Sequence, residues 1–384
     1  MEDGALVVEE GKVAWMGTMS AFKRRAPGTM KTVDARNSLV TPGFVDPHTH
    51  LAFAGAREDE LERKVRGESY ISILEHGGGI ARTIRDTREA TEERIVRESS
   101  DRLKQLVANG VTTAEVKTGY GQNTEDELKL LRSFPKISRE AGAEVVPTFL
   151  GLHATPEGFG KASDYVDYAV KEMLPAVSAS KVRPVFSDCF CEDGVFSNED
   201  CRKYLRASAS LGFRLKIHAD EFRESGGAEL AASMGCVSAD HLVHSGAVGV
   251  EAMGKKGVVA VLLPGTSLLS GIKYADARAI GEAGSPIALG TDLSPNSWIE
   301  SPQMVMALAC AGLRLTPEEA LLGFTRNAAH AIGRDDIGTL KVGARADFVL
   351  HSVPGYRFLP YRVGGSYVEK VFRGGKEIFS KPEI

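Results

Sequence analysis

The feature that most restricts the possible folds is one alternation that runs from about Val40 to Arg334. Short apolar runs rich in β-branched residues are each followed by a Gly or polar turn and then by a charged, amphipathic stretch. This alternation is typical of units in which a β-strand is followed by an α-helix. Eight runs fit the strand pattern: GFVDPHTH, VTTAEVKTG, EVVPTFLGLH, RPVFSDCFCE, FRLKIHADEF, SADHLVHS, VVAVLLPGT and PIALGTDLSP.

Eight successive units predict an α/β protein with a closed (β/α)8 barrel of the TIM type rather than an open doubly wound sheet. The repeating part, residues 41–334, is close in length to the roughly 250 residues typical of this fold. Helices are expected between the strands, among them at residues 92–108, 126–141, 198–211 and 302–312. We therefore expect residues 41–334 to form one barrel domain that carries the catalytic site.

The two ends of the chain show a different pattern. Residues 5–17 (ALVVEEGKVAWMG), 338–352 (GTLKVGARADFVLHS) and 368–379 (VEKVFRGGKEIF) alternate apolar and polar side chains around Gly turns. Such alternation is typical of antiparallel hairpins. Segments 1–40 and 335–384 are therefore expected to pair into one small β-sheet domain built from both ends of the chain.

Composition limits the possible functions. The 384 residues include 47 Lys plus Arg and 51 Asp plus Glu, a formal charge of −4, so the basic surface of a nucleic-acid-binding protein is not expected. The longest apolar run, VVAVLLP, is far shorter than the roughly 20 residues needed to cross a membrane. The acidic N-terminal stretch lacks a secretory signal pattern, and five sparse cysteines predict no disulfide framework. We expect a cytoplasmic enzyme that acts on a small molecule.

Histidines mark the ends of several predicted strands. His48 and His50 end the first strand in VDPHTH, and residues i and i+2 of a strand point to the same face. Four more strand ends carry a histidine or an aspartate, namely His153, His218, His241 and Asp292. Barrel enzymes place their active sites at the carboxyl ends of the strands, so these side chains are expected to meet at one mouth of the barrel.

The types of these side chains indicate a metal centre. Imidazoles with one carboxylate suit zinc or iron, whereas Mg and Ca prefer oxygen ligands. One transition metal ion per chain is therefore predicted. Lys117, at the end of the second predicted strand, is an alternative ligand if it forms a carbamate between two metals. A mononuclear site without Lys117 is favoured, because the histidines and Asp292 already complete one ion with a water.

These motifs together resemble the amidohydrolase superfamily of metal-dependent barrel hydrolases. The superfamily pattern is PGFVDPHTH, followed by histidines on the fifth and sixth strands and an aspartate on the eighth. HTHLAFAGAREDE, EVKTGYG, TFLGLHATP and HADEF are similar to one branch of that superfamily, and the similarity covers nearly the whole chain. That branch opens the imidazolone ring of 4-imidazolone-5-propanoate to give N-formimidoyl-L-glutamate in histidine degradation.

The resemblance implies a role for each site residue. The implied metal ligands are His48, His50, His218 and Asp292. The implied substrate contacts are Arg57, Tyr120, His153, Glu221, Ser294, Asn296 and Ser297, the last three in a stretch that departs from the family pattern. The implied catalytic residues are Glu221, His241 and Asp292. Arg57 would bind the propionate, because a guanidinium offers two parallel donors to a carboxylate.

Proton transfer leaves two assignments open. Expulsion of the ring nitrogen needs a proton from a nearby acid, and either Asp292 or Glu221 can supply it. In the arrangement that we favour, Glu221 binds the ring nitrogen and helps to move a proton. His241 then orients the attacking water, and Asp292 accepts its proton.

Two other functions are compatible with the sequence. The chain could be another cyclic amidase or deaminase of the superfamily that acts on a nucleobase-like ring, although a neutral purine has no use for the anion clamp of Arg57 and Tyr120. It could also be a catalytically silent scaffold, which missing ligands would reveal, but every ligand residue is present. A homodimer is expected for a barrel of this size.

Overall fold

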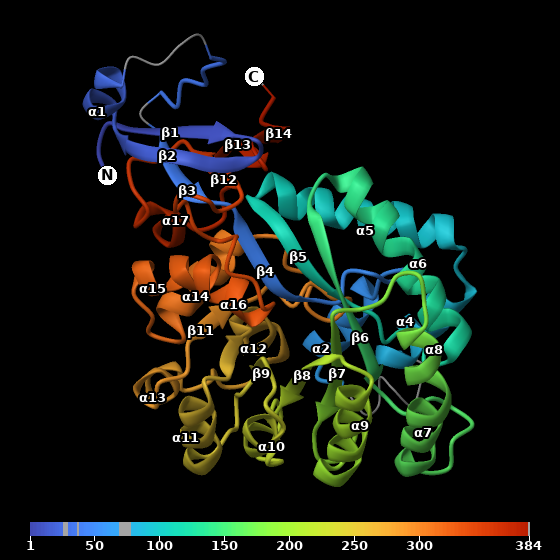
Figure 1. Ribbon diagram of the computed structural model, residues 1–384. Coiled ribbons are helices and arrows are strands. Elements are labelled where there is room, and N and C mark those ends of the chain that lie inside the picture. Colours follow the sequence, from blue (N-terminus) through green and yellow to red (C-terminus); the bar gives the residue numbers. More distant parts are fainter. Residues whose placement is uncertain (26–29, 37, 69–77, 383–384) are drawn as a thin grey trace.

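The computed structural model describes the chain except for residues 26–29, 37, 69–77 and 383–384. Its main part is an eight-stranded parallel sheet whose strands follow one another in chain order (Figure 1). These strands are β4 (Phe44–Thr49), β5 (Val111–Lys117), β6 (Glu144–Leu152), β7 (Phe186–Cys191), β8 (Arg214–Ala219), β9 (Ser238–His241), β10 (Val259–Leu262) and β11 (Ile287–Leu289). All eight predicted strands are present, and the barrel prediction is confirmed.

The barrel closes between its first and last strands. A parallel bridge joins Thr49 to Leu293, just beyond β11. The backbone amide of His50 donates to the Leu293 carbonyl at 2.9 Å, and that of Asp292 donates to the His48 carbonyl at 3.1 Å. Barrel closure therefore fixes Asp292 beside the two histidines of β4.

Helices cover the outside of the barrel (Figure 1). Those between β4 and β9 are α2 (Glu58–Val65), α4 (Gly79–Glu89), α5 (Glu92–Ala108), α6 (Thr124–Ala141), α7 (Ala162–Tyr168), the π-helix η1 (Ala169–Met173), α8 (Leu174–Ser178), α9 (Asn198–Ser210) and α10 (Gly227–Met234). Those after β9 are α11 (Ala247–Lys256), α12 (Pro264–Ser270), α13 (Ala277–Glu282), α14 (Pro302–Ala311), α15 (Pro317–Gly323) and α16 (Arg326–Ala331). In the described part of the chain, none of the helices is long and apolar enough to cross a membrane.

Helix boundaries follow the capping residues. The predicted helix at residues 92–108 is α5 without any shift. Helix α6 begins at Thr124 rather than at residue 126, because the side chain of Asn123 accepts the Asp126 amide and caps the helix earlier. Helices α9 and α14 each end one residue before the predicted boundary. Local sequence signals therefore located these helices to within two residues.

A small antiparallel sheet lies beyond the amino ends of the barrel strands (Figure 1). Its strand order is β14–β13–β12–β3. The four strands are β3 (Leu39–Pro42), β12 (Phe348–His351), β13 (Val368–Arg373) and β14 (Lys376–Ser380), and the short α17 (Phe358–Tyr361) follows β12. Both ends of the chain thus contribute to one sheet, as predicted. The boundaries proposed for the domains, at residues 40/41 and 334/335, stay a prediction.

Two details differ from the expected hairpins. Strands β1 (Gly4–Glu9) and β2 (Lys12–Thr18), with α1 (Met19–Arg24) after them, form a hairpin that is a sheet of its own. Residues 338–352 were expected to form a hairpin, but β12 is the one strand in this stretch. The physical reason is that the Val13 amide donates to the Ala344 carbonyl and the Ala346 amide donates to the Gly11 carbonyl, at 2.9 Å each. These bonds dock the β1–β2 hairpin instead.

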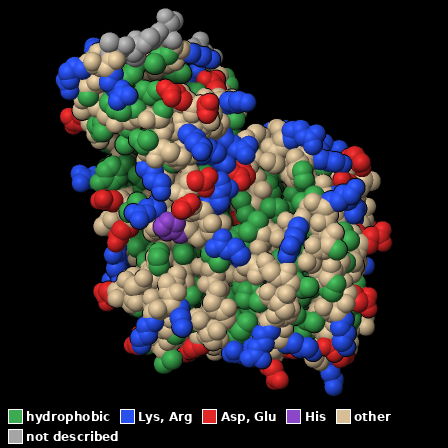
Figure 2. Space-filling view, viewed as in Figure 1, with side chains coloured by type: hydrophobic (Ala, Val, Ile, Leu, Met, Phe, Trp, Pro, Cys, Tyr) green, Lys and Arg blue, Asp and Glu red, His purple; other side chains and the backbone are tan. Residues whose placement is uncertain are grey.

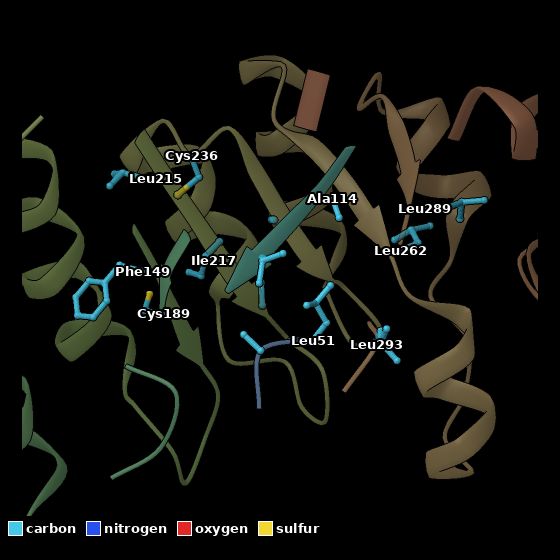
Figure 3. Close-up of a cluster of buried hydrophobic side chains, with 14 of the residues drawn as sticks. Leu51, Ala114, Phe149, Cys189, Leu215, Ile217, Cys236, Leu262, Leu289 and Leu293 are labelled. Carbon is cyan, nitrogen blue, oxygen red and sulfur yellow. The ribbon is translucent and has the colours of Figure 1, made fainter. Parts of the chain in front are cut away.

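The alternation of side chains along the barrel strands separates an apolar layer from a charged interior. Figure 3 shows Ala114, Ile217, Leu262 and Leu289, from four strands, in the apolar cluster that also contains side chains of the outer helices. The alternate positions of β8 carry buried polar side chains, such as Lys216, whereas those of β10 carry Val259 and Val261 of a second apolar cluster. Part of the barrel interior is therefore polar and contains ionisable groups that face one another.

Candidate active site

The histidines of β4 and β8 meet inside the barrel. His50 Nε2 lies 3.2 Å from His48 Nε2 and 3.3 Å from His218 Nε2. All three side chains are buried. In the described part of the chain, they form a group of ligand atoms close enough to share one metal ion.

The protonation pattern of these rings fits a bound cation. His48 Nδ1 lies 2.6 Å from Asp240 and His218 Nδ1 lies 3.1 Å from Asp188. Both rings therefore carry their N–H on Nδ1 and leave a lone pair on Nε2. Burial lowers the pKa of His48 and His50 well below the usual value, which keeps these rings neutral.

The distances within the group fit as well. Two nitrogens that each lie about 2.0–2.1 Å from one ion are roughly 3.3 Å apart in tetrahedral geometry. The separations of 3.2 and 3.3 Å between the Nε2 atoms match this value. Converging lone pairs repel one another unless a cation lies between them, so this donor set fits a transition metal.

Asp292 faces the same group. Its Oδ1 lies 3.5 Å from His48 Nε2 and 3.6 Å from His50 Nε2, while Thr266 Oγ1 donates to its Oδ2 at 2.6 Å. Burial raises the pKa of Asp292 to about 6, against the lowering effect of the Thr266 hydrogen bond. The backbone of Asp292 has φ +51°, a strained value for a residue with a side chain that is often found at active sites.

His241 and Glu221 lie on the side of β8 and β9. The ring centroid of His241 is 5.4 Å from that of His48 and 5.4 Å from that of His218. Glu221 Oε1 lies 3.7 Å from His241 Nδ1. Burial, together with the charge of Asp292, raises the pKa of Glu221 well above its usual range. A protonated Glu221 beside a neutral His241 is suited to proton transfer.

Tyr120 and His153 line another side of the site. The His153 ring stacks on His50 with centroids 5.0 Å apart, and the Tyr120 ring lies 5.1 Å from His153. The Gly119 carbonyl lies 3.2 Å from His153 Nδ1, which places the N–H there. Burial lowers the pKa of His153 to about 3. His153 therefore offers a neutral acceptor at Nε2.

Arg57 lies in the loop between β4 and α2, outside this group of aromatic contacts. Its Nε is 3.7 Å from Glu60 Oε2, and 7% of its side chain is exposed. That Nε is buried without a hydrogen-bond partner. The structure thus leaves a donor of Arg57 free, but it does not place Arg57 against the histidines.

The three residues predicted after Asp292 differ in burial. Ser294 and Ser297 are buried, and Asn296 is partly buried. The Ser297 amide donates to Ser294 Oγ at 3.1 Å, and Ser297 Oγ lies 3.4 Å from Thr266 Oγ1. Ser297 is therefore tied to the residue that also holds Asp292, so its contacts shape the Asp292 turn.

Two carboxylates that no sequence motif indicated lie behind the histidines. Asp188 in β7 and Asp240 in β9 are fully buried and orient His218 and His48. Lys117 Nζ lies 2.7 Å from Asp188 and 2.9 Å from Glu115, and these charges raise the pKa of Lys117 despite its burial. A carbamate needs a neutral amine and adds a negative charge, so this setting favours the mononuclear alternative.

Comparison with known proteins agrees with this geometry. Residues 60–379 match the model of the Amidohydrolase family. The chain is 44% identical over 382 residues to an imidazolonepropionase of Shouchella clausii, across 98% of this chain and 85% of the relative. It is also 44% identical over 380 residues to an imidazolonepropionase of Parabacteroides distasonis, across 98% and 91%. The chain belongs to the imidazolonepropionase family of amidohydrolases.

Solved structures show that the imidazolonepropionase fold is shared more widely. The guanine deaminase of E. coli superimposes with a TM-score of 0.77 at 18% identity, across 100% of this chain and 93% of that chain. An atrazine chlorohydrolase from Arthrobacter aurescens, complexed with zinc, superimposes with a TM-score of 0.74 at 18% identity, across 98% and 90%. At these identities the likeness concerns the fold alone, so the choice of substrate depends on the site.

Proposed function

We propose that this chain hydrolyses the cyclic amide bond of 4-imidazolone-5-propanoate to give N-formimidoyl-L-glutamate in histidine degradation. The observation that carries the proposal is the convergence of three Nε2 atoms, from His48, His50 and His218, beside Asp292. The imidazolonepropionases of similar sequence support the choice of substrate.

One transition metal ion, zinc or iron, would be held by His48, His50, His218 and Asp292. When bound, such an ion polarises the amide carbonyl and makes water a better nucleophile near neutral pH. Nitrogen and carboxylate ligands suit both metals. The solved atrazine chlorohydrolase of the same fold is complexed with zinc, which supports zinc without excluding iron.

The chain's own residues move the protons. Asp292 accepts the proton of the attacking water, because its carboxylate lies beside the group of histidines that would hold the ion. His241, beside His48 and His218, orients the water. As the carbon–nitrogen bond of the ring breaks, protonated Glu221 donates to the departing nitrogen.

Arg57 and Tyr120 recognise the propionate tail. The buried Nε of Arg57 has no partner, so a carboxylate of the substrate would satisfy it and gain a charge-assisted bond. The stacked His153 accepts from the ring, and Ser294, Asn296 and Ser297 contact the substrate or product from the Asp292 turn. A tailed, anionic substrate fits this set better than a neutral ring does.

A second candidate function is deamination or ring opening of a nucleobase-like substrate. It is favoured by the fold that this chain shares with guanine deaminase. The buried Nε of Arg57 favours the anionic substrate instead, since a guanidinium binds a carboxylate more strongly than it binds the neutral acceptors of a purine.

The cellular setting is part of the proposal. The five cysteines are free, and four of them are buried, which suits a reducing compartment such as the cytoplasm. We place the enzyme there as a homodimer that binds neither nucleic acid nor membrane.

The experiment that tests this function combines metal analysis with an absorbance assay. Purified protein should contain about one zinc or iron ion per chain and should remove the ultraviolet absorbance of the imidazolone ring. Imidazolone without the propionate and guanine serve as matched controls and should react poorly. Faster turnover of guanine, or full activity after a chelator has removed the metal, would contradict the proposal.

A further inference from the structure

Two lysines are fully buried inside the barrel, beneath the histidines. The side chains of Lys117 in β5 and Lys216 in β8 are 0% exposed. Burying an ammonium group is costly unless ionised partners surround it, and barrel interiors are usually filled by branched apolar residues. Packing of the core therefore does not explain why two charged side chains are buried here, which suggests that they act on the groups around them.

Lys117 lies where two carboxylates meet. Its Nζ donates to Asp188 Oδ2 at 2.7 Å and lies 3.7 Å from Asp240 Oδ2. Asp188 comes from β7 and Asp240 from β9, so one ammonium connects three strands of the barrel. Both carboxylates are fully buried, and without a cation between them they would repel each other.

Each of these carboxylates also holds one histidine of the site. Asp188 Oδ1 lies 3.1 Å from His218 Nδ1, and Asp240 Oδ2 lies 2.6 Å from His48 Nδ1. Lys117 therefore contacts the two carboxylates that orient His218 and His48, two of the three rings whose Nε2 atoms converge.

These two carboxylate–histidine pairs, Asp188–His218 and Asp240–His48, are the two branches of the network. Lys216 supports the Asp240–His48 branch. Its Nζ donates to Ser238 Oγ at 2.7 Å and lies 3.6 Å from Asp240. Ser238 Oγ in turn donates to Asp240 Oδ1 at 2.6 Å. Among the described residues, the carboxylate of Asp188 has no such second lysine, so the His218 branch depends on Lys117 alone for its cation.

We infer that Lys117 is a positioning residue of the metal centre, which holds Asp188 and Asp240 so that His218 and His48 present Nε2 to the ion. The inference rests on the metal-dependent function proposed above. Loss of a group that orients metal ligands typically weakens metal affinity by about 10–100-fold, and we expect a loss of this size for Lys117→Met. The two branches should not respond equally, since Lys216 still holds Asp240.

Glu115 provides the matched control. It lies on the same strand, is equally buried, and accepts from Lys117 Nζ at 2.9 Å. In the described structure its carboxylate does not contact the site histidines. Glu115→Gln should therefore disturb the buried charges as Lys117→Met does but leave the metal affinity close to that of the wild type.

The experiment measures Zn²⁺ affinity directly. Metal-free wild type, Lys117→Met and Glu115→Gln compete with a chromophoric chelator for Zn²⁺, and circular dichroism checks that each variant is folded. The visible spectrum of the Co²⁺-loaded proteins reports the geometry of the ligands, and we expect it to change in Lys117→Met but not in Glu115→Gln. If Lys117→Met does not fold, Lys117→Gln, which keeps a donor for Asp188 without the charge, takes its place.

The possible results separate the inference from the function on which it rests. Weaker Zn²⁺ binding by the Lys117 variant, with near-normal binding by Glu115→Gln, supports the inference. Equal affinities of the Lys117 variant and the wild type overturn it and leave the proposed function intact. Equal losses in both variants overturn it too, since they indicate a general effect of packing. A wild type that binds no Zn²⁺ overturns the proposed function itself.

Discussion

Glu221 and His241 form the contact in the active site that is best suited to move a proton. The two side chains lie 3.7 Å apart, and burial raises the pKa of Glu221 well above its usual range. Glu221→Gln keeps the shape but cannot release a proton. We expect it to retain its metal and to lower kcat by roughly 100-fold or more, the scale of lost general acid–base catalysis.

Steady-state kinetics with metal analysis of the same preparation checks this prediction. Glu224→Gln, an exposed carboxylate in the same loop, is the control and should behave as the wild type. A kcat near that of the wild type in metal-loaded Glu221→Gln would assign the proton transfer to Asp292 and His241 alone.

Arg57 has a buried Nε without a hydrogen-bond partner, 3.7 Å from Glu60 Oε2. Arg57→Lys keeps the charge but loses the two parallel donors that match a carboxylate. KM for the tailed substrate should rise by a factor that corresponds to about 1.5–3 kcal/mol, the contribution of a hydrogen bond to a charged group. Arg66→Lys, on an exposed arginine nearby, should leave KM unchanged. An unchanged KM in Arg57→Lys would remove Arg57 from the substrate site.

At the scale of elements, α5 anchors the loop that carries Arg57. Arg102 in α5 donates to the carbonyls of Leu51 at 3.0 Å and Phe53 at 2.6 Å. Its guanidinium also lies 3.5 Å from the ring centroid of Phe53 and 5.0 Å from that of Trp298. One side chain therefore joins the loop after β4 to the loop after β11.

Arg102→Met should loosen both loops. The buried carbonyls of Leu51 and Phe53 would lose their donors, and each such loss costs about 1–3 kcal/mol. We expect a lower free energy of unfolding in urea, together with a higher KM. Arg97→Met, on an exposed position of the same helix, should change neither quantity. A destabilised variant with the wild-type KM would show that α5 supports the fold without positioning the substrate loop.

At the scale of the whole molecule, a cluster of charges joins the small sheet to the barrel. Glu144, at the start of β6, pairs with Arg334 at 2.8 Å and with Arg345, and it lies 3.9 Å from Arg373. Acidic and basic side chains gather where the lobe of the small sheet meets the barrel (Figure 2). The carboxylate of Glu144 thus interacts with three arginines from the C-terminal part of the chain.

This cluster should make stability depend on pH. Burial opposes ionisation of Glu144, but the hydrogen bonds and charges of Arg345 and Arg334 lower its pKa below the usual value. The folded state then binds fewer protons than the unfolded state. The contribution is therefore fully present above the usual pKa of about 4.3 and is lost as the pH falls through the lowered value.

Glu144→Gln tests this coupling. It should lower the free energy of unfolding at pH 7 by about 1.5–3 kcal/mol, the range for hydrogen bonds to charged groups. The difference from the wild type should shrink as the pH falls below about 4. Urea titrations at several pH values measure it, with the exposed Glu140→Gln at the end of α6 as control. A difference that stays constant with pH would contradict the role of the Glu144 charge.

Much of this architecture is readable along the chain. Period-two alternation and helical amphipathicity depend on neighbours close in sequence, which is why all eight barrel strands and the boundaries of α5 were predicted. Because the carboxyl ends of parallel strands share one edge, His48, His50 and His218 could be expected at one place without knowing the fold in detail. The roles assigned to the site residues, from the metal ligands to Arg57, Ser294 and Asn296, stay predictions.

Other features depend on which distant side chains the closed barrel brings together. Lys117 contacts Asp188 across 71 residues of sequence, and His48 contacts Asp240 across 192. No local pattern encodes such pairs, because they depend on the stagger of the strands around the barrel. The same holds for residues 338–352, whose alternation predicted a hairpin but whose backbone groups bond to Gly11 and Val13. Alternation of apolar and polar residues shows that a segment can form a strand. Its partner depends on whether a neighbouring or a distant strand pairs with it more favourably, and only the tertiary structure shows which one does.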